Sequence, residues 1–355
     1  MITLAIILLA LGFIGLALWD QFWTTFGEGG GPVTRRLAGA VWQLARATHH
    51  RADSGRLLSA AGGLATMATV SCWTLLLWLG WTLLFWASGS GVVDAAAGEP
   101  ADVWDRVYFA GYTISTLGIG DVQPRGGVAR VLTAAASLIG VMQLSLAMAY
   151  LVPVVTAAKA KRRVAAEISA VGASSADILL NAWDGRRFAR LDDQLAALTP
   201  SLVQLAQSYA AYPVLPYFHS RHRSEAIGLR LATLDEALTL LSCAVNRDAL
   251  GDRVLSGSVF YGLRRGVTTV LDTLATAAYR DAPSVPPAPS LRPLREAGVP
   301  VVSDQTFAER LYDLDDRRRG LAMLVAMDGW AWDDLEAEGA GGAHDRTPLH
   351  RLEAI

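Results

Sequence analysis

Three long apolar stretches without charged residues dominate the hydropathy pattern of the chain. They run from Ile2 to Trp19, from Leu64 to Ala87 and from Val131 to Ala158. A helix rises about 1.5 Å per residue and needs about 20 apolar residues to cross a bilayer, so each stretch is long enough to span one. The third is longer than a perpendicular crossing needs, which predicts a tilted helix or one that extends past the bilayer.

The first stretch has two interpretations, a retained anchor helix or a cleaved signal peptide. Signal peptides begin with a positive region and end at a small-residue cleavage site. No Lys or Arg precedes this stretch, and the bulky sequence Leu18-Trp19-Asp20-Gln21-Phe22-Trp23 surrounds its end. The pattern therefore favours a retained transmembrane anchor at residues 1–20.

The second half of the chain has a helical pattern without membrane-length apolar runs. Apolar residues recur at alternating spacings of four and three in four stripes, which start at Leu191, Ile227, Phe260 and Phe307. This period is typical of helix bundles and of coiled coils, and it favours a packed α-helical domain at 164–335 over an intersubunit coiled coil. A Pro-rich linker is predicted at 283–302, and the Gly- and charge-rich end at 336–355 is predicted to be disordered.

Composition fits a chain that is part membrane and part soluble domain. Of the 355 residues 52% are hydrophobic and 18% charged, and the formal net charge is −2. A basic stripe with interleaved aromatics, as nucleic-acid binding requires, is not found. Cys72 and Cys243 have neither metal-ligand nor disulfide-framework spacing and are expected to be reduced, buried side chains. With no catalytic triad or metal-ligand cluster in the sequence, we predict neither an enzyme nor a bound cofactor.

The distribution of basic residues predicts the orientation in the membrane. Five arginines lie between the first two apolar stretches, and four basic residues follow the third. They are Arg35, Arg36, Arg46, Arg51 and Arg56, then Lys159, Lys161, Arg162 and Arg163. The positive-inside rule places the basic loop 21–63 and the C-terminal domain in the cytoplasm. The N-terminus and the loop after residue 87 then face outward, as in a multi-pass protein of the cell membrane.

A short helix is predicted between the second and third apolar stretches. Asp102 is a suitable N-cap, and Asp105 adds a second negative charge in the first turn. The helix would run over 103–115 and end before a glycine-rich segment. It is too short and too polar to span a bilayer, so it is predicted to re-enter the membrane, where irregular backbone must be buried in protein or line a watery cavity.

The segment that follows this helix reads Thr116-Leu117-Gly118-Ile119-Gly120-Asp121. Glycine adopts positive φ without steric cost, and alternating such residues with ordinary ones turns successive carbonyls toward one side. A ring of such carbonyls replaces the hydration shell of a cation. The C-terminal end of the preceding helix is partially negative and also favours a cation.

These residues resemble the two-transmembrane pore module of potassium channels, whose motif is Thr-x-Gly-Tyr-Gly-Asp. Thr116, Gly118, Gly120 and Asp121 match the motif, and Thr113 and Ser115 match its hydroxyl-rich lead-in. Arg130 and Gly140 occupy the positions where the family often has an arginine and a hinge glycine. The resemblance covers 64–163, with an outer helix at 64–87, a pore helix at 103–115, a filter at 116–121 and an inner helix at 131–158.

The resemblance implies potassium as the permeant ion, bound by the backbone carbonyls of Thr116, Leu117, Gly118 and Ile119. Tyr112, Thr113 and Ser115 would support the filter from the pore helix. A filter ring needs four strands and the chain holds one copy of the motif, so a homotetramer is required. The expected fold is an all-α membrane protein that contains this module, an added N-terminal helix and a cytoplasmic helical domain that gates it through an unknown ligand or partner.

Two positions depart from the family pattern. Ile119 stands where the family usually has Tyr, so the carbonyl is kept but the aromatic support is lost, and a non-selective cation channel of the same fold becomes an alternative. Tyr112 stands where some bacterial members have a Glu that bonds the filter Asp, and its hydroxyl is a candidate partner for Asp121. A membrane-anchored sensor or scaffold that does not conduct is a third alternative.

Several polar or helix-softening residues keep two interpretations. Gly140 and Pro153 are either gating hinges or, for Gly140, a site of close helix packing. Gln143 either faces a watery cavity or bonds a neighbouring helix. The cluster from His219 to Arg223 is expected in a solvated loop, and Arg317, Arg318 and Arg319 are expected to pair with nearby aspartates on a helix surface. No G-x-G-x-x-G motif supports a nucleotide-binding domain.

Overall fold

The computed structural model describes residues 1–27, 29–52, 55–246, 257–278 and 284–336. The chain divides into two compact units. The N-terminal unit comprises Met1–Thr156 and the short segment Ala211–Val214, and the C-terminal unit comprises Ala157–Ala210 and the chain from Leu215 onward. Each unit is a separate packed body, and helix α5 contributes residues to both.

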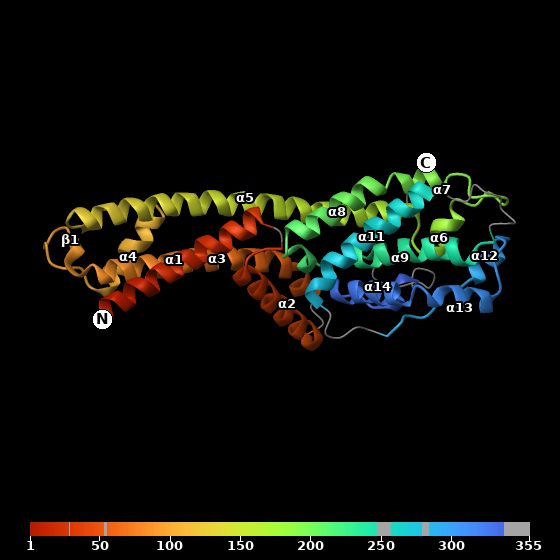
Figure 1. Ribbon diagram of the computed structural model, residues 1–355, viewed down its shortest axis with the longest axis horizontal. Coiled ribbons are helices and arrows are strands. Elements are labelled where there is room, and N and C mark those ends of the chain that lie inside the picture. The colour runs from red at the N-terminus through yellow and green to blue at the C-terminus, as the bar shows by residue number, and fades with distance from the viewer. Residues whose placement is uncertain (28, 53–54, 247–256, 279–283, 337–355) are drawn as a thin grey trace, which may run out of the picture. The chain divides into compact units, whose positions relative to one another are not determined.

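Five helices build the N-terminal unit (Figure 1). They are α1 (Ile2–Phe26), α2 (Pro32–Ala52), α3 (Gly55–Ala87), α4 (Val103–Ile114) and α5 (Gly127–Val171). Among the described residues, three helices are long and apolar enough to cross a membrane, namely α1, α3 from Ser59 to Ala87, and α5. The predicted all-α membrane fold is confirmed.

The segment 21–63, predicted to be a loop, contains helix α2 and the first turns of α3. Pro32 is the first residue of α2, where its fixed φ favours helix and its missing N–H is not needed. Thr34, Ala38 and Trp42 are buried at a spacing of four, which gives α2 one packed face that lies against α3. The density of arginines obscured this pattern in the sequence.

Helices α3 and α5 are also longer than the apolar stretches that predicted them. The outer helix begins at Gly55 rather than at 64, and the inner helix runs over Gly127–Val171 rather than over 131–158. The length of an apolar stretch predicts only the part of a helix that lies in the hydrocarbon of the bilayer. The helix itself continues beyond that part where its polar residues find partners. Pro153 lies inside α5, which continues on both sides of it.

The core of the N-terminal unit is a cluster of apolar side chains between α1, α3 and α4. Phe85 and Phe109 meet edge-to-face at 4.8 Å between ring centroids, and Trp81 and Tyr112 extend the cluster. Aromatic packing on this scale fixes α4 against α3 although α4 is only 12 residues long.

A short sheet joins the two loops that flank α4. Strand β1 (Val92–Asp94) pairs antiparallel with β2 (Val122–Pro124), with Val93 opposite Gln123. Val92 and Val122 are buried, so the sheet belongs to the core. Strands of three residues have too little alternation to be predicted from sequence.

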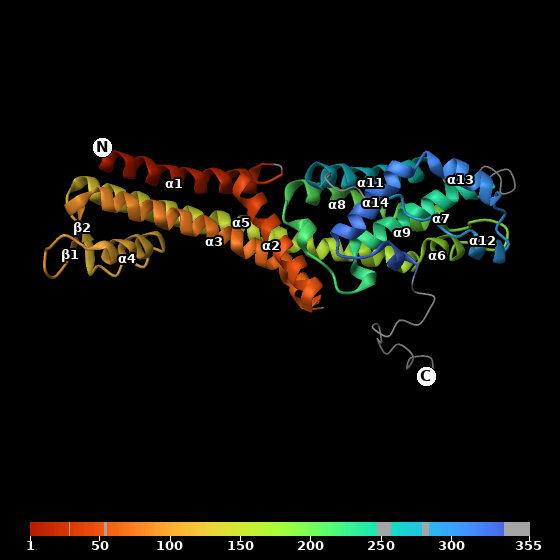
Figure 2. The ribbon, with the colours of Figure 1, turned by 90° about the horizontal axis from the view of Figure 1, so that it is seen from below.

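The C-terminal unit is a helical bundle around α9, as Figure 2 shows from a second direction. Its helices are α6 (Ser175–Leu180), α7 (Leu191–Ala196), α8 (Thr199–Ala211), α9 (Ile227–Thr239), α11 (Gly257–Ala278), α12 (Arg292–Glu296), α13 (Asp304–Tyr312) and α14 (Asp315–Met327). A π-helical turn follows α9 at Leu240–Ala244, and 3₁₀ turns lie at Leu215–Tyr217, Arg223–Glu225 and Trp332–Leu335. Every residue of α9 is buried.

Two predicted boundaries in this half differ from the structure. The predicted linker 283–302 contains the short helix α12, which Pro293 helps to begin, and residue 283 itself lies outside the described residues. The stripe from Leu191 is divided between α7 and α8, whose second residue is Pro200. Of the tail 336–355, only Glu336 is described.

The charged residues on α14 pair across the bundle rather than locally. Arg317 contacts both carboxylate oxygens of Asp235 at 2.7 and 2.8 Å, and Arg318 contacts Glu236 at 2.8 Å. Only Arg319 pairs with a near neighbour on its own helix, Asp316. Burial raises the pKa of the Glu236 carboxyl, against the opposing effect of the Arg318 guanidinium. The prediction of local pairing was wrong for two of the three arginines, because the acidic residues of α9 are buried and require partners.

The last turns of α5 are fixed in the C-terminal unit by a buried ion pair. Lys161 is 2% exposed and its Nζ lies 3.1 Å from Asp328 Oδ1 and 2.9 Å from the Phe218 carbonyl oxygen. Asp328 also accepts from the Gly228 amide, and the Asp328 carbonyl lies 2.6 Å from His219 Nδ1. His219 is therefore buried, and not in a solvated loop as predicted.

Candidate pore site

Helix α4 begins with a reciprocal capping box. The Asp102 side chain accepts from the Asp105 amide at 2.8 Å, and the Asp105 side chain accepts from the Asp102 amide at 3.1 Å. Two amides that have no partner within the helix are satisfied, and both carboxylates lie at the positive end of the helix dipole. The cap fixes where α4 starts and therefore which residue ends it.

Replacing Asp102 by Ala is expected to lower the stability of the protein by about 1 kcal/mol, because one amide of α4 loses its acceptor. Thermal melting of the purified protein in detergent measures this effect. Asp102→Asn, which keeps an acceptor oxygen, is the matched control and should melt near the wild type. Equal melting of Asp102→Ala and the wild type would contradict the role of the cap.

The C-terminal end of α4 leads directly into the filter segment. The Thr116 amide donates to the Thr113 carbonyl at 3.1 Å, and the Leu117 amide donates to the Tyr112 carbonyl at 2.9 Å. These two bonds form a Schellman motif, whose left-handed position is usually glycine. Here that position is Thr116, with φ of 59°. A β-branched residue in this conformation is strained, which indicates that its side chain or carbonyl is needed there.

Positive φ recurs at every second residue of the segment. Thr116, Gly118 and Gly120 have φ of 59°, 60° and 87°, and Leu117 and Ile119 between them do not have positive φ. No described residue donates a hydrogen bond to the carbonyls of residues 116–119. By contrast, the Gly120 carbonyl accepts from the Gln123 side chain and the Asp121 carbonyl accepts from the Ala95 amide. Four consecutive carbonyls are therefore free, and the next two are occupied.

The outer end of the segment is held by α4 and the sheet. The Tyr112 hydroxyl donates to the Val122 carbonyl, in the first residue of β2, and not to Asp121. Tyr108, one turn earlier on α4, interacts through its hydroxyl with the Asp121 carboxylate. The two tyrosines thus connect the helix to the last residue of the filter segment and to the residue after it. The sequence had left the partner of Tyr112 open.

The remaining side chains of the predicted site have different surroundings. The Ser115 hydroxyl donates to the Tyr112 carbonyl at 3.2 Å, whereas the Thr113 hydroxyl is buried without a described partner. Leu117 and Ile119 are 66% and 52% exposed in the single chain. These two residues form an apolar surface at the filter segment that the single chain leaves exposed.

At Gly140 the inner helix packs directly against the last residue of the pore helix. A Cβ atom built at Gly140 would lie 1.9 Å from the Ile114 carbonyl oxygen and 2.7 Å from its carbon. Only a hydrogen fits in this contact. The structure therefore places Gly140 at a site of close helix packing, while a hinge role for Gly140 and Pro153 remains a prediction.

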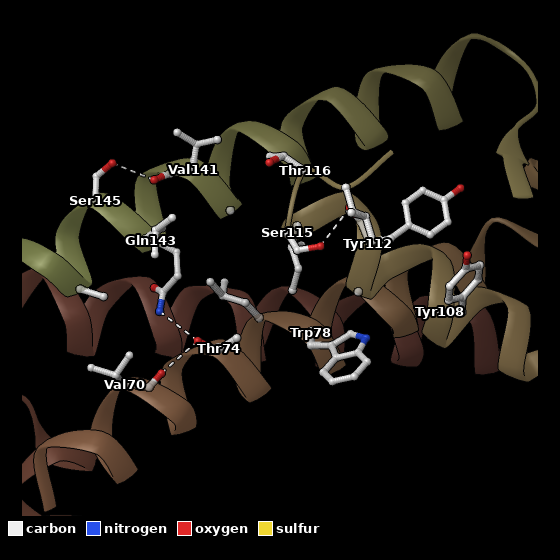
Figure 3. Close-up of a pocket in the computed structure, with 17 residues that line it drawn as sticks. Val70, Thr74, Trp78, Tyr108, Tyr112, Ser115, Thr116, Val141, Gln143 and Ser145 are labelled. Atoms are coloured by element: carbon white, nitrogen blue, oxygen red, sulfur yellow. Dashed lines mark hydrogen bonds between the residues drawn. The ribbon is translucent and has the colours of Figure 1, made fainter. Parts of the chain in front are cut away.

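Gln143 lies one turn after Gly140 and connects α5 to two other helices (Figure 3). Its Nε2 donates to the Thr74 hydroxyl of α3 at 3.4 Å. The main-chain carbonyl oxygen of Gln143 accepts from Gln21 Nε2 of α1 at 3.1 Å. The N-terminal anchor is therefore bonded directly to the inner helix.

Asp20, next to Gln21, was not identified from the sequence. Its side chain is fully buried and accepts from the Val33 amide at 2.7 Å, from the Thr34 hydroxyl at 2.7 Å and from Trp73 Nε1 at 2.8 Å. The Thr34 amide makes a further bond at 3.2 Å. The carboxylate caps the N-terminus of α2 and fixes it to α3. A lone acidic residue at the end of an apolar stretch was the available signal, because such residues are costly and are kept where they have partners.

Comparison with known proteins identifies the module. A family model described as Ion channel matches residues 72–157, which include the C-terminal part of α3, all of α4, the filter segment and much of α5. The chain is also 30% identical to the uncharacterized membrane protein YdjJ of Bacillus subtilis (strain 168) over 343 residues, which are 97% of this chain and 98% of that protein. The chain belongs to the pore-loop ion channel family. No solved structure matches it.

The family match confirms the resemblance drawn from the motif residues. In this pore-loop channel the motif lies between two candidate membrane helices, directly after the capped helix α4. YdjJ matches nearly the whole chain, so the similarity also includes α1, α2 and the C-terminal unit. These parts lie outside the region that the channel model matches.

Proposed function

We propose that the protein conducts potassium ions passively through a homotetrameric filter formed by Thr116–Asp121. The free carbonyls of residues 116–119, with positive φ at alternate positions, support this proposal most directly. Alternation of φ turns successive carbonyls toward one side, and four copies around an axis would surround a dehydrated ion with oxygens. The contact between Gly140 and Ile114 adds support, because it holds the segment against the inner helix.

The proposed orientation places the filter at the outer face of the cell membrane and the C-terminal unit in the cytoplasm. The arginines before α3 and the basic residues after the apolar part of α5 support it through the positive-inside rule. Gating through the C-terminal unit is part of the proposal. The buried Lys161–Asp328 pair supports it, since any rearrangement of the unit that displaces α14 acts on the end of α5.

Potassium flux into liposomes that contain the purified protein tests the proposal. Wild type is expected to carry flux, and Gly118→Asp, which changes the backbone at φ of 60° and adds a charge, is expected to abolish it. No flux above that control would favour a non-conducting sensor or scaffold. The mass of the protein in detergent is a second test, because a stable monomer or dimer contradicts a four-fold filter.

A non-selective cation pore of the same fold is the second candidate. The observation that favours it is Ile119, whose side chain is half exposed and supplies no hydroxyl or aromatic ring behind the filter. Selectivity for potassium depends on the size of the carbonyl ring or on the field strength of its carbonyl dipoles. An aliphatic side chain behind the ring stabilises its geometry less than an aromatic one does.

Replacing Ile119 by Tyr is expected to raise the potassium-to-sodium permeability ratio, because a ring and a hydroxyl are added behind the carbonyls. Bi-ionic reversal potentials in planar bilayers give the ratio for both proteins. Ile119→Leu, which keeps an aliphatic side chain, is the control and should match the wild type. Equal permeability of the two ions in the wild type would decide for the non-selective pore.

A further inference from the structure

A cavity of about 630 Å³ lies beneath the filter in the N-terminal unit (Figure 3). Three helices and the start of the filter line it on one side, and its wall is mostly apolar. Leu77 and Trp78 come from α3, Ile114 from α4, Leu117 from the filter and Leu144 from α5. This volume is within the range of small-molecule sites, about 300–1,000 Å³.

Three side-chain donors on the membrane helices of the wall are used within the protein. The Thr74 hydroxyl donates to the Val70 carbonyl, and the Trp78 indole donates to the Val107 carbonyl. The Ser145 hydroxyl donates to the Val141 carbonyl at 2.9 Å. A ligand that offers only acceptors finds none of these three donors available.

One buried side-chain acceptor in the wall has no partner among the described residues. Gln143 is 7% exposed, and its Oε1 is buried without a described hydrogen bond. The hydrogen bonds around Thr74 determine which atom of the Gln143 amide faces it. Thr74 gives its only proton to Val70, so its oxygen must accept, and the NH₂ group of Gln143 must therefore face Thr74. The unpaired atom is then the amide oxygen, and a buried acceptor without a donor is costly.

We infer that this cavity binds a membrane-soluble amphiphile with an apolar tail and one hydroxyl, such as a medium-chain alcohol, whose hydroxyl donates to Gln143 Oε1. This assignment rests on the polarity of the wall, because its buried side-chain atom without a described partner is an acceptor within an apolar surface. A phospholipid acyl chain fits the apolar wall but brings no donor. Thr116 and Leu117 line the same cavity, so an occupant lies against the filter.

Photolabelling of the full-length protein in detergent or liposomes tests the inference, with 3-azioctanol as the probe. Label is expected in peptides that contain Val70–Trp78 and Val141–Ala147. 1-Octanol is expected to displace it at concentrations roughly two- to tenfold lower than methyl octyl ether does, because only the alcohol supplies a donor. Binding in this cavity does not depend on conduction, so labelling reports on it even if the pore carries no flux.

Two substitutions sharpen the test. Gln143→Met removes the acceptor at similar size and is expected to abolish the preference for the alcohol while the labelling persists. Ser145→Ala, in the same wall, removes a hydroxyl already bonded to Val141 and is expected to keep the preference. Equal displacement by alcohol and ether in the wild type would overturn the inference and indicate an acyl-chain site. Absence of label from both peptides in the assembled protein would overturn it too, since a neighbouring copy would then fill the cavity.

Discussion

Gly140→Ala is expected to abolish ion flux and to lower the stability of the protein by about 3 kcal/mol or more. The added methyl would lie 1.9 Å from the Ile114 carbonyl oxygen, which is far inside van der Waals contact. The obstacle is backbone and has no rotamer to change, so α5 must move away from α4. Overpacking of a fixed core costs typically about 1–3 kcal/mol, and a backbone obstacle is at the upper end or beyond it. Ile114 is two residues before Thr116, so the displacement also reaches the filter.

Thermal melting in detergent and liposome flux measure the two effects. Gly127→Ala is the matched control, because Gly127 lies at the start of the same helix with no atom within 4 Å of its built Cβ. That variant should melt at or slightly above the wild-type temperature, since Ala favours helix by up to about 1 kcal/mol. If Gly140→Ala melts like the wild type but changes the fraction of time the pore is open, Gly140 acts as a hinge and not as a packing site.

The pore module could be predicted from the sequence because its signals are local. Membrane helices follow from apolar length, and α4 follows from Asp102 and Asp105 in its first turn. The glycines at 118 and 120 predict positive φ, and both have it. Thr116 could not be predicted to share this conformation, because its φ is set by the Schellman bonds to Thr113 and Tyr112 and not by its own preference.

Features that depend on distant partners could not be predicted. Arg317 is near three aspartates in the sequence, yet its partner is Asp235, 82 residues away on a buried helix. Helix α2 could not be predicted either, because only a few of its described residues are buried. Their helical spacing gives a weak hydrophobic pattern among so many charged residues. The contact between Gly140 and Ile114 is another case, since only the packed structure chooses between a hinge and a close approach.

Asp20→Ala is expected to cost about 3–5 kcal/mol, which is as large an effect as that of Gly140→Ala. The Val33 amide, the Thr34 amide and Trp73 Nε1 would each lose an acceptor in a fully buried place. An unsatisfied buried donor costs about 1–3 kcal/mol, and relaxation around the shortened side chain recovers part of the sum. Because Asp20 connects α1, α2 and α3, the melting temperature and the mass of the assembled protein in detergent are both expected to fall.

Two further variants separate charge from hydrogen bonding at Asp20. Asp20 accepts bonds at both carboxylate oxygens, as an ionised group does, whereas Asn presents one acceptor oxygen and two N–H donors toward groups that are donors themselves. Asp20→Asn is therefore expected to lose nearly as much stability as Asp20→Ala, although its shape is preserved. Trp73→Phe removes a single donor and is expected to cost less stability than either Asp20 variant. A wild-type melting temperature for Asp20→Asn would show that packing, and not the pair of acceptor oxygens, holds α2 to α3. The neighbouring Gln21 donates a hydrogen bond to the backbone of α5, so the same variants also test whether the N-terminal helix contributes to ion conduction. If the variants that lose the Asp20 bonds still carry flux, the role of α1 and α2 is limited to anchoring.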